Sequence, residues 1–212
     1  IVRCTLEDRF NDIWVGTENG CNVIAGDTFS RIGAKNGLKG NLVLSLLEDR
    51  EGNTWFGTTE GLSCLYSRKF RNYSKRDGLG NNLVWEIIED RKKRLWMATE
   101  DGLSCFSRGT FKNYSTKDGL LSNNIYRVYE DRKGRILIGT NNGLNIYYNG
   151  KFSARTRKDG LNSTNIMSLY EDREGTLWAG TSRGLNRSVD EASSFSAPGL
   201  NIPPVVIYNI FE

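Results

Sequence analysis

The side chains best suited to hold a polar ligand lie at equivalent places in similar segments of the chain. Trp85 and Tyr126 offer flat aromatic faces that can stack on sugar rings. Each is followed by a charged residue, Glu86 or Arg127, which can fix hydroxyl or carboxylate groups by hydrogen bonds. We therefore predict a ligand site from the variable residues at this place: Arg3, Trp85, Glu86, Tyr126, Arg127 and Met167. The alternative is that these side chains only fill space.

These residues are comparable because the chain is a tandem repeat with a period of 41 residues. The triplet Glu-Asp-Arg begins at Glu7, Glu48, Glu89, Glu130 and Glu171. A tryptophan follows in phase in four copies, at Trp14, Trp55, Trp96 and Trp178, with Leu137 in the fourth copy. Residues that are identical in every copy are most simply structural. Residues that vary between copies can recognise one particular ligand.

Each repeat reads as four short strands joined by tight turns. In the second copy we expect strands at residues 42–48, 54–58, 62–66 and 70–73, with a longer loop at residues 74–81. Four antiparallel strands in a unit of about 40 residues are typical of a β-propeller blade. The fold class predicted is therefore all-β, a β-propeller with five visible blades over residues 1–198. The first strand of each blade is expected to be innermost and to line a central channel.

The repeated residues fit structural roles in such a blade. Asp49 and Gly52 bound a turn, in which Gly52 supplies a positive φ. We therefore interpret the repeated Glu-Asp pairs as turn and cap residues. Trp14, Trp55, Trp96 and Trp178 are expected to form the core between blades, because each blade needs neighbours to bury its apolar faces.

The composition argues against several kinds of chemistry. The 212 residues include no histidine, so the usual general base and metal ligand are missing. No metal site, cofactor or catalytic residue is predicted, and we interpret the segment as a non-enzyme. The net charge of +4 comes from interleaved basic and acidic residues, which does not favour nucleic-acid binding. No apolar stretch is long enough to cross a membrane, so no membrane contact is expected in this segment.

The sequence does not determine the redox state of the four cysteines. They are Cys4, Cys21, Cys64 and Cys105. No CxxC spacing occurs, which disfavours a zinc site. Cys64 and Cys105 occupy the same place in successive copies, as small buried strand residues would. A disulfide between neighbouring blades is the alternative.

The last part of the chain departs from the repeat. In the fifth copy Ser193 stands where phenylalanine is expected, with Phe195 nearby. Residues 199–212 contain a pair of prolines followed by β-branched residues. We interpret this tail as a linker and the first strand of a following domain.

The repeat resembles a known family. The fifth copy reads Glu-Asp-Arg-Glu-Gly-Thr-Leu-Trp-Ala-Gly-Thr over residues 171–181, with Gly184 and Leu185 after it. This pattern resembles the two-component regulator propeller repeat, over residues 1 to about 187. The resemblance implies the periplasmic sensor region of a membrane-anchored hybrid two-component histidine kinase. There the propellers usually have seven blades and are followed by a small β-sandwich, and many such receptors answer to oligosaccharides.

Two functions from different classes follow. The first is a ligand-sensing propeller that binds an oligosaccharide or another small polar molecule at the channel mouth. The second is a scaffold: either a free-standing five-bladed propeller that binds carbohydrate or a protein partner, or a fragment of a larger ring whose unpaired blade faces drive formation of a homodimer. A lyase or hydrolase, as in the streptogramin lyases of similar repeat length, is disfavoured by the absence of histidine.

Overall fold

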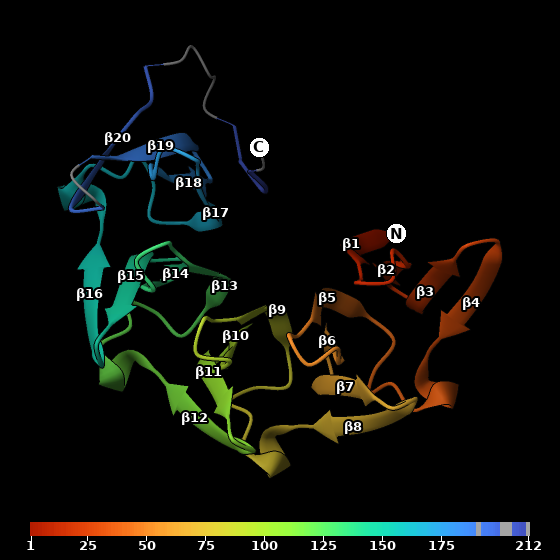
Figure 1. Ribbon diagram of the computed structural model, residues 1–212. Helices are drawn as coiled ribbons and strands as arrows, with labels where there is room; N and C mark the ends of the chain where they lie inside the picture. The colour runs from red at the N-terminus through yellow and green to blue at the C-terminus, as the bar shows by residue number, and fades with distance from the viewer. Residues whose placement is uncertain (190–191, 200–204, 211–212) are drawn as a thin grey trace. The chain divides into compact units, whose positions relative to one another are not determined.

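The computed structural model describes residues 1–189, 192–199 and 205–210, and over this part it confirms the predicted all-β blades. Each blade is a four-stranded antiparallel sheet whose strands follow one another in chain order (Figure 1). Blade 1 consists of β1 (Val2–Glu7), β2 (Ile13–Thr17), β3 (Gly20–Ala25) and β4 (Thr28–Ile32). Blade 2 consists of β5 (Val43–Glu48), β6 (Thr54–Thr58), β7 (Leu62–Tyr66) and β8 (Lys69–Tyr73).

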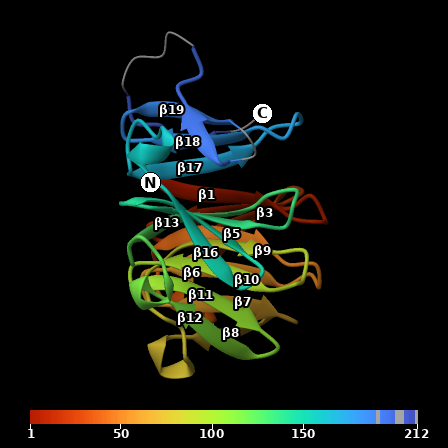
Figure 2. The same ribbon diagram turned by 90° about the vertical axis from the view of Figure 1, so that its left-hand side faces the viewer.

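The remaining three blades repeat this order. Blade 3 consists of β9 (Val84–Glu89), β10 (Leu95–Thr99), β11 (Gly102–Ser107) and β12 (Thr110–Tyr114). Blade 4 consists of β13 (Ile125–Glu130), β14 (Ile136–Thr140), β15 (Gly143–Tyr148) and β16 (Lys151–Arg155). Blade 5 consists of β17 (Ile166–Glu171), β18 (Leu177–Thr181), β19 (Gly184–Val189) and β20 (Ser194–Ser196), and Figure 2 shows β18 between β17 and β19.

The chain forms two compact units. Unit 1 contains residues 1–100 and 104–113, and therefore blades 1 and 2 and most of blade 3. Unit 2 contains residues 101–103 and 114–212, and therefore blades 4 and 5. Within unit 1, β5 lies beside both β1 and β9, and within unit 2 β17 lies beside β13. The first strand of each of these blades is thus packed against the first strand of its neighbour, and the common channel stays a prediction.

A side-chain cap closes the turn between the first two strands of a blade. The Asp49 carboxylate accepts the backbone N–H groups of Glu51 and Asn53, at 3.0 and 2.8 Å, and the indole N–H of Trp55 at 2.7 Å. Gly52 completes the turn at φ +85°, where a side chain is disfavoured. The aspartate and the tryptophan six residues later therefore fold the turn together.

The loop that connects two blades contains a feature not predicted from the sequence. A single turn of 3-10 helix forms in each loop: η1 (Ala34–Asn36), η2 (Lys75–Asp77), η3 (Thr116–Asp118) and η4 (Arg157–Asp159). In η2 the Asp77 carboxylate accepts both the backbone N–H and the hydroxyl of Ser74, each at 2.8 Å. Gly78 then ends the turn at φ +100°. These turns are too short to show an apolar helical period.

The hydrophobic core consists of clusters in which aromatic residues of neighbouring blades meet. Trp55 and Tyr73 of blade 2 stack at a centroid distance of 6.0 Å. Phe106 of blade 3 approaches Trp55 at 5.9 Å and Tyr73 at 5.2 Å. Trp14 and Trp55 are buried, Trp96 is fully buried, and Trp178 is half-buried. Burial of several aromatic rings between blades 2 and 3 stabilises the contact between these blades.

All four cysteines are free thiols. Cys21, Cys64 and Cys105 are buried in strands, and Cys4 is half-buried. Burial raises the pKa of the Cys4, Cys21 and Cys64 thiols to about 12 and that of Cys105 to about 11. At neutral pH they are therefore protonated and poor nucleophiles, as expected of small core residues.

The fifth blade and the tail keep part of the pattern. The last strand, β20, is only three residues long, and Phe195 within it is buried. In the tail, the Ile207 N–H donates to the Thr181 carbonyl at 3.0 Å, and the Ser168 hydroxyl donates to the Ile207 carbonyl at 3.2 Å. Residues 205–210 are not part of a strand. Much of the predicted linker lies outside the described residues, and the following domain stays a prediction.

In the described part of the chain no helix is long and apolar enough to span a membrane.

Candidate functional site

The predicted ligand residues lie at a backbone irregularity that every blade contains. In blade 3, Val84 pairs with Thr99 and Glu86 with Ala98, so that Trp85 between them has no partner on the neighbouring strand. In the other blades the same shift in register leaves one residue without a partner on the neighbouring strand: Arg3, Leu44, Tyr126 or Met167. This is a β-bulge, a feature enriched beside binding and catalytic sites because it redirects a side chain. We call these five positions the bulge positions.

Within unit 1 the bulge positions lie on adjacent strands. Arg3 is on β1, Leu44 on β5 and Trp85 on β9, and β5 lies between the other two. Trp85 and Glu86 are half-buried, whereas Arg3 is exposed and forms an ion pair with Glu18. Arg3 and Trp85 are therefore separated by the Leu44 strand, and this unit offers one aromatic face, one carboxylate and one guanidinium along the row.

Within unit 2 three predicted residues lie on two neighbouring strands. Tyr126 and Arg127 lie on β13 and Met167 lies on β17, the neighbouring strand. All three are half-buried. The Arg127 guanidinium donates to the Tyr126 carbonyl at 3.0 Å and to the Tyr208 carbonyl at 3.3 Å. Its position is thus set by the backbone of its own strand and of the tail.

A cavity in unit 1 was not anticipated from the sequence. It has a volume of about 440 Å³ and lies between blades 2 and 3, away from the bulge positions. Its lining combines Trp55 and Phe106 with acidic Glu51 and basic Lys92 and Lys93. In the sequence, the one indication of this cavity was Lys93, which stands where other copies have the turn glycine. The cavity is large enough for a small polar molecule.

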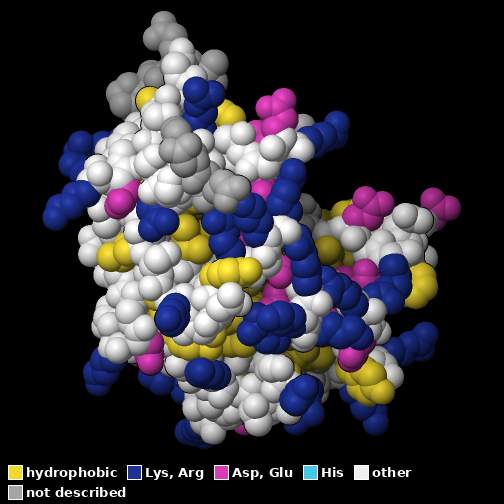
Figure 3. All heavy atoms as spheres, turned by 60° about the vertical axis from the view of Figure 1, so that its left-hand side comes forward, with side chains coloured by type: hydrophobic (Ala, Val, Ile, Leu, Met, Phe, Trp, Pro, Cys, Tyr) yellow, Lys and Arg dark blue, Asp and Glu magenta, His cyan; other side chains and the backbone are white. Residues whose placement is uncertain are grey.

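Charge on the surface is mixed. On the face drawn in Figure 3, Lys and Arg side chains are interspersed with Asp and Glu and with exposed hydrophobic groups. The whole chain carries 29 basic and 25 acidic residues. Among the described residues, no cluster of three or more carboxylates and thiols could hold a metal ion.

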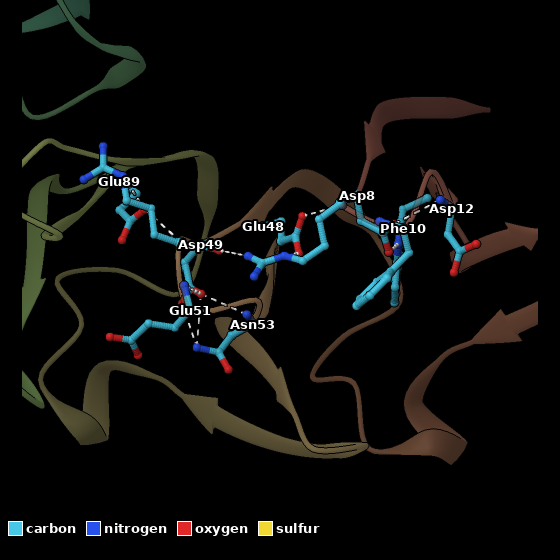
Figure 4. Close-up of polar contacts among 11 residues, drawn as sticks. Asp8, Phe10, Asp12, Glu48, Asp49, Glu51, Asn53 and Glu89 are labelled. Atoms are coloured by element: carbon cyan, nitrogen blue, oxygen red, sulfur yellow. Dashed lines mark hydrogen bonds and ion pairs between the residues drawn. The ribbon is translucent and has the colours of Figure 1, made fainter.

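In blades 1, 2 and 4 the arginine of the Glu-Asp-Arg triplet contacts the next blade. Arg9 of blade 1 donates its backbone N–H to the Glu48 carboxylate at 2.9 Å and its side chain to the same carboxylate and to the Asp49 carbonyl (Figure 4). Arg50 of blade 2 contacts Glu89 and the Asp90 carbonyl in the same way, each at 3.0 Å. We call this set of contacts the inter-blade clamp.

Unit 2 contains another inter-blade clamp. The Arg132 backbone N–H donates to the Glu171 carboxylate at 2.6 Å, and its guanidinium donates to the carbonyls of Asp172 and Arg173. The interpretation of the Glu-Asp pairs as turn and cap residues was therefore wrong for the glutamate. Aspartate caps the turn, but glutamate receives the arginine of the preceding blade. The sequence of a repeat alone does not show which copy a side chain contacts.

The capping aspartates have lowered pKa values. Burial raises the pKa of the Asp90 carboxyl, but hydrogen bonds from the Trp96 indole, the Arg94 backbone and the Arg94 side chain outweigh burial and leave the pKa below its ordinary value. The same balance lowers the pKa of Asp8, Asp49 and Asp172, with the indole of each blade again as a donor. These carboxylates are structural acceptors, and they are ionised at neutral pH.

The fold and the repeated site define a protein built from β-propeller blades. Four segments match the family model of the two component regulator propeller, at residues 37–60, 78–101, 119–142 and 160–183. Each segment starts at the glycine that ends a 3-10 turn and extends through the first two strands of a blade. The chain therefore carries two-component regulator propeller repeats, as predicted. No curated protein matches the chain significantly.

Solved structures support this assignment. The chain is 27% identical, with a TM-score of 0.79, to the extracellular domain of a protein from B. thetaiotaomicron described as a hybrid two component system. The match covers 93% of this chain and 28% of that one. A second such domain from B. thetaiotaomicron is 23% identical, with a TM-score of 0.67, over 100% of this chain and 35% of that one. The chain thus spans about a third of the length of these relatives.

Other structures share the fold alone. Virginiamycin B lyase from Staphylococcus aureus is 11% identical, with a TM-score of 0.74, and the match covers 96% of this chain and 72% of that one.

Proposed function

We propose that this chain is an extracytoplasmic ligand-sensing segment of a hybrid two-component sensor histidine kinase, located in the periplasm as part of a membrane-anchored receptor. Its ligand is an oligosaccharide or another small polar molecule. The segment itself is not catalytic. The similarity to the extracellular domain of a hybrid two component system, at 27% identity over 93% of the chain, supports the receptor class.

The observation that carries the binding role is the bulge. The same backbone shift recurs in all five blades, yet its side chain is Arg3, Leu44, Trp85, Tyr126 or Met167. Because the bulged residue has no cross-strand partner, its side chain can change without changes in the sheet. A constant scaffold that presents variable aromatic and charged groups suits recognition of one ligand. Blades that serve only as a scaffold do not require this variation.

The proposal is tested by binding measurements on single variants. Trp85→Ala and Tyr126→Ala are compared with the unsubstituted chain by titration calorimetry against a panel of oligosaccharides, including uronic-acid-containing ones that would pair with Arg127. We expect at least one of the two substitutions to weaken binding about tenfold or more, since an aromatic face on a sugar ring contributes about 1–2 kcal/mol.

Tyr66→Ala provides the matched control, because Tyr66 is an aromatic residue at the end of β7 with 65% of its surface exposed. It should leave affinity unchanged. Equal affinity in Trp85→Ala, Tyr126→Ala and the control would reject the bulge positions as the site.

A further inference from the structure

The cavity between blades 2 and 3 lies at the opposite end of the first strands from the bulge positions. Most of its lining comes from the β5–β6 turn, the β9–β10 turn and the hairpin between β11 and β12. Trp85 lies near the start of β9, whereas Glu89, at the end of the same strand, lines the cavity. None of the bulge positions belongs to the lining. A molecule in this cavity would therefore use a different set of side chains.

Three cations line the cavity and face one exposed acid. Lys92, Lys93 and Arg108 are exposed, and within the described part of the chain the Arg108 guanidinium has no hydrogen bond or ion pair. Glu51 is the exposed acid, and its carboxylate lies 3.9 Å from the Lys93 ammonium. The two side chains are 69 and 60% exposed, so this long ion pair contributes little stability. The cavity thus has an excess of positive charge.

The other two carboxylates of the lining are already engaged. Asp49 accepts the Trp55 indole N–H at 2.7 Å and the Asn53 amide at 2.9 Å, and Glu89 accepts the Arg50 backbone N–H at 3.0 Å (Figure 4). Asp49 is buried, and the Glu89 side chain is only 10% exposed. Because these donors hold both groups, they oppose a single negative charge in the cavity only weakly.

Two of the cations occupy turn positions that disfavour long side chains. Lys93 has φ +59°, at a place where blades 2, 4 and 5 have glycine. Arg108 has φ +51°, at a place where blade 1 has glycine and blade 4 has asparagine. The left-handed backbone is costly for bulky side chains, and such strain is concentrated at functional sites. That both strained cations line one cavity is an observation independent of the excess charge, and it also indicates a binding site.

The apolar wall suits an aromatic ring better than a sugar. Trp55 is only 5% exposed and is stacked on Tyr73 at an interplanar angle of 20°, so it offers no open face on which a sugar ring could lie. Phe106, which is half-buried, meets Trp55 edge to face at a centroid distance of 5.9 Å. A further aromatic ring can extend such an edge-to-face cluster, and nearby cations attract its face.

We propose that this cavity is a second binding site, for a small aromatic carboxylate. The carboxylate is held by Lys93 and Arg108, and the ring lies against Phe106 and Trp55. A guanidinium binds a carboxylate through two parallel hydrogen bonds, which suits the unengaged Arg108. The acids in the same lining disfavour a ligand with a second negative charge, since like charges repel. This inference does not depend on the ligand proposed for the bulge positions.

The test uses trans-cinnamate, a small aromatic carboxylate, and cinnamamide, its uncharged analogue. Each is titrated into the isotope-labelled chain, and the backbone amide shifts are followed by NMR. We expect saturable shifts with cinnamate at the two turns and the hairpin of the cavity, and binding at least about fivefold weaker with cinnamamide, because its amide forms no ion pairs. Equal affinity for the two compounds, the absence of saturable shifts, or shifts centred on Trp85 would overturn the proposal.

Lys93→Gly and Arg108→Asn remove the cations without adding strain. Each substitution introduces the residue that blade 4 has at that turn, so both variants should fold at least as stably as the unsubstituted chain. Each should weaken cinnamate binding about fivefold, and the double variant about twentyfold. Arg68→Asn is the control, since Arg68 is an exposed cation at φ +63° in the hairpin of blade 2 and lies outside the lining. An equal loss in Arg68→Asn would mean nonspecific charge attraction and would overturn the proposal.

Two further measurements test the ring and the independence of the site. The sugar carboxylate glucuronate should bind about tenfold more weakly than cinnamate, because it gains no aromatic contact. Tighter binding of glucuronate would overturn the aromatic class. Trp85→Ala should leave cinnamate affinity unchanged, so that failure of this site and failure of the bulge positions remain distinguishable. Cinnamate should also raise the urea midpoint of the unsubstituted chain but not that of the double variant. Equal rises would place the ligand elsewhere and reject the cavity.

Discussion

The two ends of the first strand of each blade differ in whether the five copies have the same residues. At the C-terminal end, β9 finishes in Glu89 and is followed by Asp90 and Arg91, a triplet found in every copy. Near the N-terminal end lies Trp85, at the bulge, where the five copies carry five different residues. One end is engaged in hydrogen bonds to the turn and to the neighbouring blade, and the other has no cross-strand partner. Contacts between blades therefore constrain the sequence at one end, and the other end is free to vary.

Acidification should disrupt the aspartate caps of blades 1, 2, 3 and 5 together. The pKa values of Asp8, Asp49, Asp90 and Asp172 are lowered in the folded state. Such groups stabilise the fold fully above the ordinary aspartate pKa of about 4, and this stabilisation is lost as the pH falls through their lower folded values. Near-ultraviolet circular dichroism of the capped tryptophans should therefore collapse only below about pH 4.

The bulge supplies the control for this titration. Trp85→Ala should leave the acid midpoint unchanged, because Trp85 takes no part in the aspartate caps. Loss of the tryptophan signal well above about pH 5 would contradict the assignment of the caps as the acid-sensitive groups.

Removal of a single cap should have the next largest effect. Asp90 is fully buried and accepts hydrogen bonds from Trp96, from the Lys92 and Arg94 backbone N–H groups and from the Arg94 side chain. Asp90→Ala leaves these donors without an acceptor, and we expect a loss of about 3 kcal/mol in the free energy of unfolding, measured in urea.

The same substitution in blade 1 sharpens the comparison. Asp8 accepts equivalent hydrogen bonds but is only half-buried, so Asp8→Ala should cost about 1 kcal/mol. Equal losses at the two positions would show that burial does not set the strength of the cap.

Loss of one inter-blade clamp should have a smaller effect. The Arg132 guanidinium is 47% exposed, and its contacts reach Glu171 and two carbonyls of blade 5. Arg132→Gln should therefore lower the free energy of unfolding by about 1 kcal/mol, and high salt should reduce the difference. A loss that salt leaves unchanged would indicate that the carbonyl contacts, rather than the ion pair, carry the effect.

The smallest expected effect is a gain in the free energy of unfolding. Lys93 holds φ at +59° in the turn where blades 2, 4 and 5 have glycine. Lys93→Gly should raise the free energy of unfolding by about 0.5–1 kcal/mol, because glycine adopts this conformation without a steric penalty. Gly134→Lys, the reverse change at φ +74° in blade 4, should lower it by a similar amount. Both are measured by urea unfolding, and a loss of stability in Lys93→Gly would show that its side-chain contacts outweigh the strain.

The sequence predicted the strands well because their positions depend on local rules. Alternating apolar residues and turn glycines placed the four strands of blade 2 within a residue or two of their observed bounds. The 3-10 turns were missed, although a signal was present. Ser74 and Ser115 are each followed three residues later by aspartate and then by glycine, which is the spacing of a capped helical turn.

The site was less predictable because it depends on hydrogen-bond register and on contacts between copies. Variation among copies pointed to Trp85, but no residue type marks a bulge whose extra residue can be arginine, leucine or methionine. The partner of Arg9 is Glu48, which lies in the same triplet one copy later, and it could not be distinguished by sequence from Glu7. The role of the residues at the bulge positions in ligand binding stays a prediction.

The inter-blade clamp has a direction. At the joints where the structure describes it, arginine reaches forward along the chain, from blade 1 to blade 2, from blade 2 to blade 3 and from blade 4 to blade 5. Each of these joints therefore has a donor side and an acceptor side, and the donor side of one blade matches the acceptor side of the next. Duplication or deletion of a 41-residue gene segment would leave each remaining joint complete. A propeller of this kind can thus gain or lose blades in evolution in single steps, without compensating substitutions at the new neighbours.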